Sequence, residues 1–312
     1  MKKLISIVIP IFNERETINE MIVNTVNTAS CWEYDYELIV VNDGSDDGSR
    51  EIIEKLCSKH MNIKLINLSR NFGHQLAFTA GLDYAKGSSV IVIDGDLQDP
   101  PDVMNMFIEK WESGYDIVYG KRLKRSGESF FKLLTSKIFY IVLDKFSDVD
   151  IPRDVGDFRL MDRKVVDKLN TMRERHRFIR GMIPWLGFKE TLVEYDRDSR
   201  FAGQTKFSFN KMVKFALDGI FSFSTVPIKY TIFLGILTVI LSLGGIVYAF
   251  VARLLTDGWV SGWTTLIITM LFIGGVQLIS IGVLGQYIGR IFEEAKHRPL
   301  YVIESTLNIE KK

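Results

Sequence analysis

Short apolar runs alternate with helix-like spacing along the first part of the chain. Strands are predicted over residues 5–9, 37–41, 64–68, 90–93 and 116–119, where β-branched residues cluster. Helices are predicted between them, over residues 14–28, 48–57, 74–85 and 102–112. This alternation predicts an α/β fold, Rossmann-like, with a mostly parallel sheet and helices on both faces. Ligands of such sheets bind at the carboxyl ends of the strands, where Pro10, Asp43 and Asp94 fall.

The last third of the chain differs, because two long stretches carry no charged residue. They run over residues 230–252 and 258–289. A membrane-spanning helix needs about 20 apolar residues. We therefore predict two transmembrane helices, over residues 230–252 and 264–288, within the segment 229–290. The short connection, in which Trp259 and Trp263 suit a membrane interface, makes them a hairpin. A buried hairpin of a soluble protein is the alternative.

Basic residues lie at the outer ends of this hairpin. They are Lys206, Lys211, Lys214, Lys229, Arg290, Lys296 and Arg298, whereas the connection has only Arg253. Because positively charged flanks stay in the cytoplasm, we predict an inner-membrane protein. Its N-terminal domain (residues 1–210), its tail (residues 291–312) and both termini would be cytoplasmic. The uncharged spans would anchor the protein without forming a translocation path. Gly285 and Gly289 suit a close helix contact, which is compatible with a homo-oligomer.

Two other segments mix basic residues with aromatic and aliphatic ones. Residues 121–145 interleave Lys and Arg with Phe130 and Phe139, and residues 211–228 repeat the pattern with Phe215. Such amphipathic segments suit an anionic membrane surface. A core-facing helix with a basic outer side has the same pattern. The second segment leads directly into the first predicted span, which favours a juxtamembrane helix there.

Composition indicates which partners and which redox environment the protein has. The 312 residues have a net charge of +1, which gives no indication of nucleic-acid binding. The two cysteines, Cys31 and Cys57, indicate reduced thiols rather than a disulfide framework. The apolar segment after Met1 is short and contains Pro10. A first strand therefore explains it better than a signal peptide does.

Acidic residues follow the strand predicted at 90–93, as the sequence Asp94-Gly95-Asp96. Gly95 permits a tight turn. Two carboxylates at one sheet edge repel each other unless a hard cation lies between them. Since Asp96 and Gln98 alternate along the chain, both can point at one ion. We therefore predict Mg²⁺ or Mn²⁺ bridging to a diphosphate. A surface turn is the alternative, because Asp-Gly is also a common hairpin signal.

Asp43 ends the second predicted strand in a similar way, before Gly44 and Ser45. A carboxylate at that edge can accept hydrogen bonds from a base or a ribose, or it can cap the next helix. No Gly-x-Gly-x-x-Gly follows the first strand, and no Walker A lysine motif occurs in the sequence. Both a conventional dinucleotide site and a P-loop are therefore disfavoured.

Five ordered motifs together resemble one enzyme family. SIVIPIFNE (residues 6–14), VVNDGS (40–45) and DGDLQDPP (94–101) look like family 2 glycosyltransferases of the GT-A fold. GDFRLM (156–161) and RFAGQTKF (200–207) extend the resemblance to the dolichyl-phosphate mannose synthase branch. The two-span tail with GRIFEE is similar to that of the bacterial bactoprenol glucosyltransferases. The resemblance thus covers nearly the whole chain and makes residues 1–210 the catalytic domain.

The resemblance implies roles for individual residues. The nucleotide-sugar would be bound by Pro10, Phe12, Glu14, Val41, Asp43, Asp94, Gly95, Asp96, Arg200 and Lys206. The metal would be ligated by Asp94, Asp96 and Gln98, and the lipid phosphate by Arg122, Lys132 and Ser136. Lys132 stands where Arg is frequent, which weakens bidentate recognition, and Phe12 stands where Tyr is common. Asp157 occupies the position of the base, where it would orient the acceptor or take a residual proton. The alternative is a loop carboxylate paired with Arg159.

The resemblance implies a membrane-bound inverting enzyme that moves a hexose from a UDP-sugar to undecaprenyl (polyprenyl) phosphate for cell-envelope glycans. Glucose is the sugar we expect, and UDP-GlcNAc, aminoarabinose and GDP-mannose donors stay open. A processive polysaccharide synthase would have more spans and a Gln-x-x-Arg-Trp motif. A sugar nucleotidyltransferase would not need the hairpin. A non-catalytic membrane-anchored binding protein would not need Asp94, Asp96 and Asp157 together.

Overall fold

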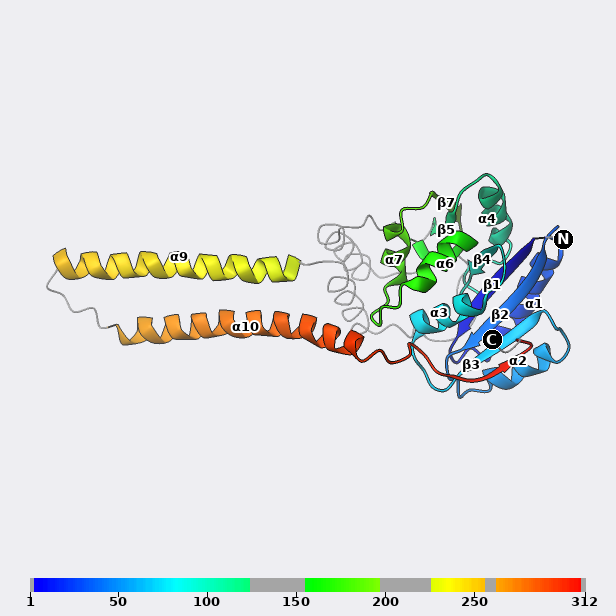
Figure 1. Ribbon diagram of the computed structural model, residues 1–312, viewed down its shortest axis with the longest axis horizontal. Helices are drawn as coiled ribbons and strands as arrows, with labels where there is room; N and C mark the ends of the chain where they lie inside the picture. Colours follow the sequence, from blue (N-terminus) through cyan, green and yellow to red (C-terminus); the bar gives the residue numbers. More distant parts are fainter. Residues whose placement is uncertain (1–2, 124–154, 197–225, 256–261, 310–312) are drawn as a thin grey trace.

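The computed structural model of the protein describes residues 3–123, 155–196, 226–255 and 262–309. Within these ranges, eight strands form one sheet in the order β7-β5-β6-β4-β1-β2-β3-β8 (Figure 1). The strands are β1 (Leu4–Ile11), β2 (Asp35–Asn42), β3 (Ile63–Leu68), β4 (Ser89–Val92), β5 (Ile117–Arg122), β6 (Val155–Asp162), β7 (Glu190–Tyr195) and β8 (Ile303–Leu307). Neighbouring strands are parallel except where β6 meets β4 and β5, and where β8 meets β3. The predicted mostly parallel sheet is confirmed.

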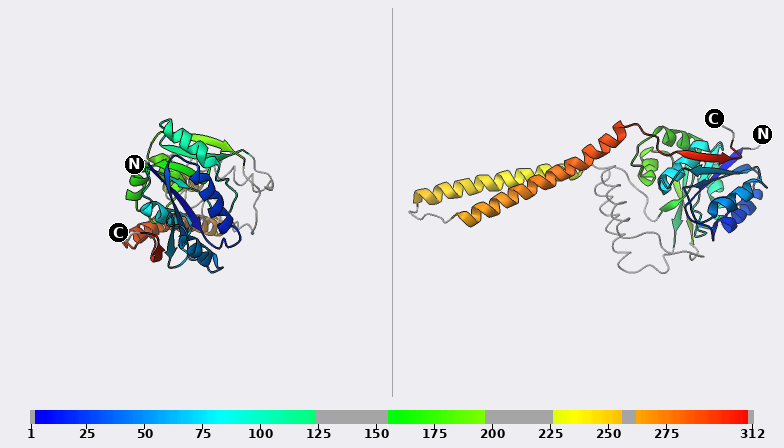
Figure 2. Two further views of the ribbon diagram at one scale, coloured as in Figure 1. Left: turned by 90° about the vertical axis from the view of Figure 1, so that its right-hand side faces the viewer. Right: turned by 90° about the horizontal axis from the view of Figure 1, so that it is seen from below.

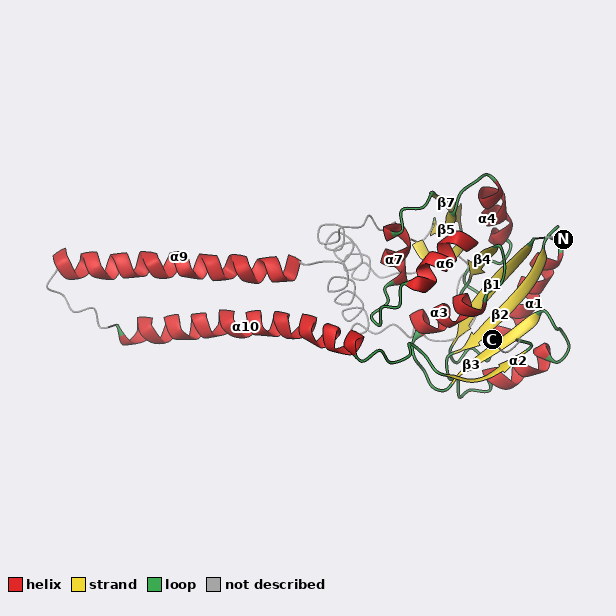
Figure 3. Ribbon diagram, viewed as in Figure 1, coloured by secondary structure: helices red, strands yellow, loops and turns green. Residues whose placement is uncertain are grey.

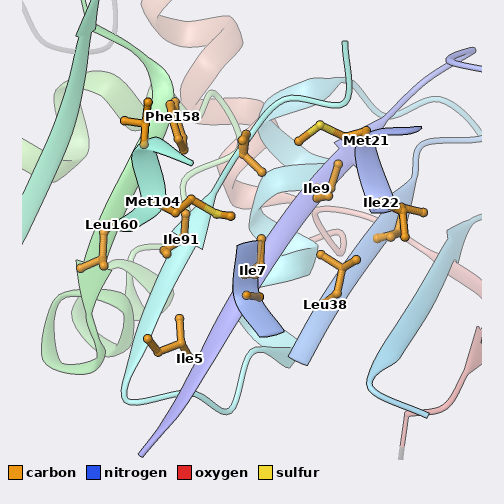
Figure 4. Packing of buried hydrophobic residues seen from close by; sticks show 14 of the residues in the cluster. Ile5, Ile7, Ile9, Met21, Ile22, Leu38, Ile91, Met104, Phe158 and Leu160 are labelled. Carbon is orange, nitrogen blue, oxygen red and sulfur yellow. The ribbon is translucent and has the colours of Figure 1, made fainter. Parts of the chain in front are cut away.

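Helices cover both faces of the sheet, as predicted. β1 is apolar on both sides, so each of its faces packs against helices. Ile5, Ile7 and Ile9 point to one face, where they pack against α1 (Ile18–Ser30), α2 (Ser49–Cys57) and α4 (Val103–Glu112) (Figure 4). Val8 points to the other face, which is covered by α3 (His74–Tyr84), α6 (Arg163–Thr171) and α7 (Ile179–Trp185). Successive side chains of a strand point to opposite faces, so two cores hold the sheet and leave its carboxyl edge for ligands.

The five predicted strands and four predicted helices all form, with ends that shift by a few residues. β6 was not predicted, because Gly156, Asp157 and Arg159 interrupt its apolar pattern. In the structure these residues are buried and bonded to one another, so the strand tolerates them. The strand ends at Asp162, whose carboxylate accepts the N–H of Lys164 at 3.0 Å and caps α6.

Part of the predicted C-terminal tail belongs to the sheet. β8 pairs antiparallel with β3, and the N–H of Ser69 donates to the carbonyl of Val302 at 2.9 Å. The Asn308 amide then donates to backbone carbonyls of Cys57, His60 and Ile63. The strand has only five residues and no long apolar run, so its pattern alone gives no strand signal. It covers the edge that β3 would otherwise present.

Two long helices, α9 (Val226–Leu255) and α10 (Trp263–Ala295), extend away from the sheet domain side by side (Figures 1 and 2). Both are regular along their described lengths (Figure 3). Segments Val226–Tyr248 and Ile268–Ala295 are long and apolar enough to cross a membrane, with mean hydropathy of 2.2 and 2.0, and neither is buried within the protein. The prediction of two long apolar helices is confirmed, and a hairpin buried in a soluble core is not what forms.

The start of α9 and the end of α10 lie on the side of the sheet domain (Figure 1). Contacts at the end of α10 fix this arrangement. The Glu294 carboxylate accepts the N–H of Arg175 at 2.7 Å, and Glu293 lies 2.8 Å from the imidazole of His176. Most of the two predicted amphipathic segments, residues 121–145 and 211–228, falls outside the described residues, as does Trp259.

Candidate active site

Asp43 organises the loop between β3 and α3. Its carboxylate is buried and accepts the backbone N–H groups of Phe72 and Gly73, at 2.7 and 2.9 Å. Burial raises the pKa of Asp43, because these N–H groups offset only part of the lost hydration. Gly73 has φ of 102°, a conformation that favours glycine. The loop therefore turns sharply at Gly73 and begins α3 with His74 at the same sheet edge.

His74 lies between two carboxylates of the site. Its Nε2 is 3.0 Å from Oδ1 of Asp94, and its Nδ1 is 3.7 Å from Oδ2 of Asp157. The surrounding protein removes part of the hydration of His74, but the bond to Asp94 and the charges of both carboxylates outweigh this and raise the pKa of His74 to about 9. Burial alone would raise the pKa of Asp94, whereas the hydrogen bond and charge of His74 hold it below its usual value. Sequence reasoning missed His74, although its place directly after Gly73 at a strand–helix junction was a usable signal.

Asp157 is held by two arginines. The Arg180 guanidinium, on α7, contacts both its oxygens at 3.1 Å, and Nη2 of Arg159 donates to Oδ1 at 3.0 Å. Burial would raise the pKa of Asp157, but the charges of Arg180, His74 and Arg159 lower it far below its usual value. Arg159 itself is fully buried and also donates to the carbonyls of Gly156 and Asp157. The pair of Asp157 with Arg159, which was the alternative to the predicted role of Asp157, thus exists. Asp157 lies in β6 and not in a loop, and the network also includes Arg180, which was not predicted.

The Asp94–Asp96 turn packs closely against the end of β1. A Cβ on Gly95 would lie 2.9 Å from Cγ2 of Ile11, and the Thr17 hydroxyl donates to the carbonyl of Gly95 at 3.0 Å. Asp96 accepts the N–H of Gln98 at 3.2 Å and stays partly exposed. Among the described residues, no group of three or more His, Cys, Asp or Glu side chains gathers to hold a metal by itself. Asp94 and Asp96 are of the residue type that a hard cation such as Mg²⁺ takes, since it commonly binds one or two protein carboxylates and completes its shell with substrate phosphates and water.

The remaining described residues of the predicted nucleotide set lie in or just after β1, or in β2. Pro10 pairs with Val41 across these strands, and the Val41 side chain belongs to the core, so only its backbone can reach a ligand. Phe12 is exposed, as a stacking side chain must be. Glu14 is partly buried near Ser49, whose hydroxyl accepts its N–H at 3.1 Å.

Arg122 is the described member of the predicted lipid-phosphate group. It ends β5, and its guanidinium bonds to Asp99 and Tyr195, two residues that sequence reasoning did not select. Lys132, Ser136, Arg200 and Lys206 lie outside the described residues. The described part of the site therefore has two sides. One side, built on β1 and β2, is where the nucleotide-sugar is predicted to bind and is called here the donor side; the other, built on β5, β6 and α7, is where the acceptor phosphate is predicted to bind and is called here the acceptor side.

Known proteins resemble this chain in sequence, and one solved structure resembles it in part. Residues 6–169 match "Glycosyl transferase family 2". "Uncharacterized glycosyltransferase YkcC" of Bacillus subtilis (strain 168) is 47% identical over 310 residues, 98% of this chain and 95% of the relative. "Bactoprenol glucosyl transferase" of Shigella phage SfV is 41% identical over 301 residues, 96% of this chain and 98% of the relative. The crystal structure of S. aureus TarS 1–349 in complex with UDP-GlcNAc has a TM-score of 0.48 at 18% identity, over 70% of this chain and 66% of that one.

Proposed function

The chain belongs to glycosyl transferase family 2, and we propose that it transfers a hexose from a UDP-sugar to undecaprenyl or another polyprenyl phosphate. Glucose is the hexose that we expect. One observation carries the acceptor: the alignment with the bactoprenol glucosyl transferase is so nearly complete that it includes both apolar helices as well as the sheet domain. A soluble acceptor would give such helices no role in substrate delivery.

The donor side would hold the nucleotide. We assign the base and ribose to Pro10, Phe12, Glu14, Val41 and Asp43, with Val41 contributing its backbone. Asp94, Asp96 and Gln98 would hold Mg²⁺ or Mn²⁺, which when bound supplies positive charge to the leaving diphosphate. Gly95 keeps this turn close to β1 and thus close to the nucleotide. Arg200 and Lys206 would contact the same diphosphate.

The reaction needs little help from a base. A phosphate monoester has a second pKa of about 6, so the acceptor is largely ionised at neutral pH. Its oxygen forms a bond to C1 of the sugar while the bond from C1 to the nucleoside diphosphate breaks, with inversion at C1. Asp157 is a poor proton acceptor, because Arg159 and Arg180 hold its pKa low. We therefore assign Asp157 to orientation: it fixes the arginines and His74 around the place where the acceptor phosphate meets C1.

The membrane arrangement follows from the same proposal. α9 and α10 would span the bilayer, so the polyprenyl chain stays in the lipid while its phosphate reaches the sheet domain. The outer ends of both helices lie on the domain side, and Lys229 and Arg290 flank them. Because positively charged flanks face the cytoplasm, the domain would face the cytoplasm, at the inner membrane of its cell.

A donor screen tests the proposal. Purified full-length protein in detergent receives undecaprenyl phosphate, Mg²⁺ or Mn²⁺, and UDP-, GDP- and dTDP-sugars one at a time, and lipid products are identified by mass spectrometry. We expect a hexosyl-phosphoryl-undecaprenol from UDP-glucose, lost on adding a chelator. Asp96→Ala, checked for unchanged thermal unfolding, is the inactive control. Product from another donor alone would correct the sugar, and no lipid product from any donor would refute the acceptor.

A further inference from the structure

Asp99 is a buried carboxylate to which the proposed mechanism gives no role. Its side chain is fully buried, and a carboxylate in such a place must be paired. The Tyr195 hydroxyl donates to its Oδ1 at 2.5 Å, and Nη2 of Arg122 donates to its Oδ2 at 3.1 Å. Nε of Arg122 also donates to the Tyr195 oxygen at 3.3 Å. The three side chains form a closed triangle, called here the Asp99 clamp.

The clamp places the Arg122 guanidinium next to Gly156 and Asp157. A Cβ on Gly156 would lie 2.6 Å from Nη2 of Arg122, so the guanidinium rests directly on the backbone next to Asp157. The Arg122 side chain is 21% exposed, whereas Asp99 behind it is inaccessible. The charge of Arg122 also helps to keep the pKa of Asp94 low. The arginine therefore lies between a buried anion and the carboxylates of the site.

We propose that Asp99 and Tyr195 are positioning residues that hold Arg122 in the orientation in which it binds the acceptor phosphate. This inference rests on the proposed function. An arginine has five N–H donors, and the clamp engages its Nε–Nη2 edge, so the Nη1–Nη2 edge is the one that binds the phosphate. Ordering a long side chain on binding costs conformational entropy and so opposes binding. The clamp removes that penalty before the acceptor arrives, and only Gly156 lets the guanidinium lie so close.

Steady-state kinetics of full-length protein in detergent distinguish positioning from simple structural support. Asp99→Asn removes the charge that pairs with Arg122, and Tyr195→Phe removes the hydroxyl that contacts both Asp99 and Arg122. Both substitutions almost keep the shape of the side chain. We expect Asp99→Asn to raise the KM for undecaprenyl phosphate about tenfold, because it removes the charge that pairs with the Arg122 guanidinium. Tyr195→Phe, which removes a neutral hydroxyl, should raise it about threefold. The KM for the UDP-sugar should change less, by at most about twofold. Asp99 follows Gln98 in the chain, but the hydrogen bonds of the clamp join Asp99, Tyr195 and Arg122 to one another.

Glu194→Gln is the matched control. Glu194 lies next to Tyr195 on β7 and pairs at 2.7 Å with Lys121, the residue before Arg122, but this pair is exposed. We expect no change in either KM, since such pairs contribute little. Arg122→Lys completes the test: in that background Asp99→Asn should raise the acceptor KM by far less than tenfold, because the arginine that it positions is gone.

The outcomes separate the two proposals. If wild-type protein forms no glycosylated lipid, the proposed function fails and this inference fails with it. If product forms but Asp99→Asn and Tyr195→Phe change donor and acceptor KM equally, or lower only the unfolding temperature, the clamp is merely structural. Should Asp99→Asn not fold, an unchanged acceptor KM in Tyr195→Phe overturns the inference by itself.

Discussion

The donor and acceptor sides hold their buried carboxylates by opposite means. Asp43 is tied to backbone N–H groups of one loop, whereas Asp157 is tied to the guanidinium groups of Arg159 and Arg180. The pKa of Asp43 is raised by burial, and the pKa of Asp157 is lowered by its arginines. The backbone N–H groups therefore order the loop but stabilise the charge of Asp43 only in part, whereas the two guanidinium groups stabilise the charge of Asp157. Asp43 thus relies on backbone geometry, whereas Asp157 relies on charge.

Asp157→Ala tests the charge-based side and has the largest expected effect. It leaves Arg159, which is fully buried, without its carboxylate. Removing one partner of a buried ion pair is expected to lower the free energy of unfolding by about 3–5 kcal/mol. Chemical denaturation in detergent, followed by tryptophan fluorescence, measures the change. A loss below about 1 kcal/mol would mean that water or other groups already compensate Arg159.

Gly44→Ala tests the backbone-based side. Gly44 has φ of 70°, and a Cβ there would lie 2.6 Å from the backbone carbonyl carbon of Arg70. We expect a loss of about 2–3 kcal/mol, from left-handed strain and from displacement of the loop that Asp43 holds. UDP affinity, measured by calorimetry, falls as well. Gly48→Ala is the matched control, because Gly48 has φ of 94° but a Cβ there would meet only the Arg15 side chain at 3.7 Å. Equal losses in both variants would contradict the loop argument.

Asp43→Asn sharpens the comparison, because it keeps the shape of the side chain. One carboxylate oxygen becomes an NH₂ group that faces a backbone N–H of Phe72 or Gly73. We expect about 1–2 kcal/mol of destabilisation and weaker UDP binding, with an unchanged KM for the acceptor. The stability and the two KM values are measured on the same preparation. An increase in the acceptor KM alone would show that the two sides are not separate.

The pH dependence of stability has the smallest expected effect, and the two carboxylates give it opposite signs. The pKa of Asp157 is lowered on folding, so its stabilisation is present above the usual Asp pKa of about 3.9 and is lost as the pH falls. The pKa of Asp43 is raised, so its contribution is complete below that pH and is lost as the pH rises through the folded value. Thermal unfolding between pH 3 and about 6 should therefore show a shallower acid-side loss for Asp157→Asn than for wild type. Asp43→Asn should remove the part of the stability that Asp43 contributes at low pH and that is lost as the pH rises.

The same contrast explains which site residues and strands could be predicted from the sequence. Asp43, Asp94 and Asp96 follow strands with clear apolar patterns, so their meeting at one sheet edge was predictable. Arg180 and Tyr195 act on residues 23 and 96 positions earlier, and no local pattern records such pairs. β6 was missed because Gly156, Asp157 and Arg159 interrupt its apolar pattern. These residues are satisfied partly by one another and partly by the distant Arg180.

β8 has a consequence for biogenesis. It follows both apolar helices in the chain, yet it pairs with β3, which is made long before them. During synthesis at about 5–20 residues per second, the sheet therefore waits for its eighth strand until α10 has left the ribosome. If either proposed span failed to insert, β8 and β3 would emerge on opposite sides of the bilayer. The edge of β3 would then stay unpaired, so completion of the sheet depends on the insertion of both proposed spans.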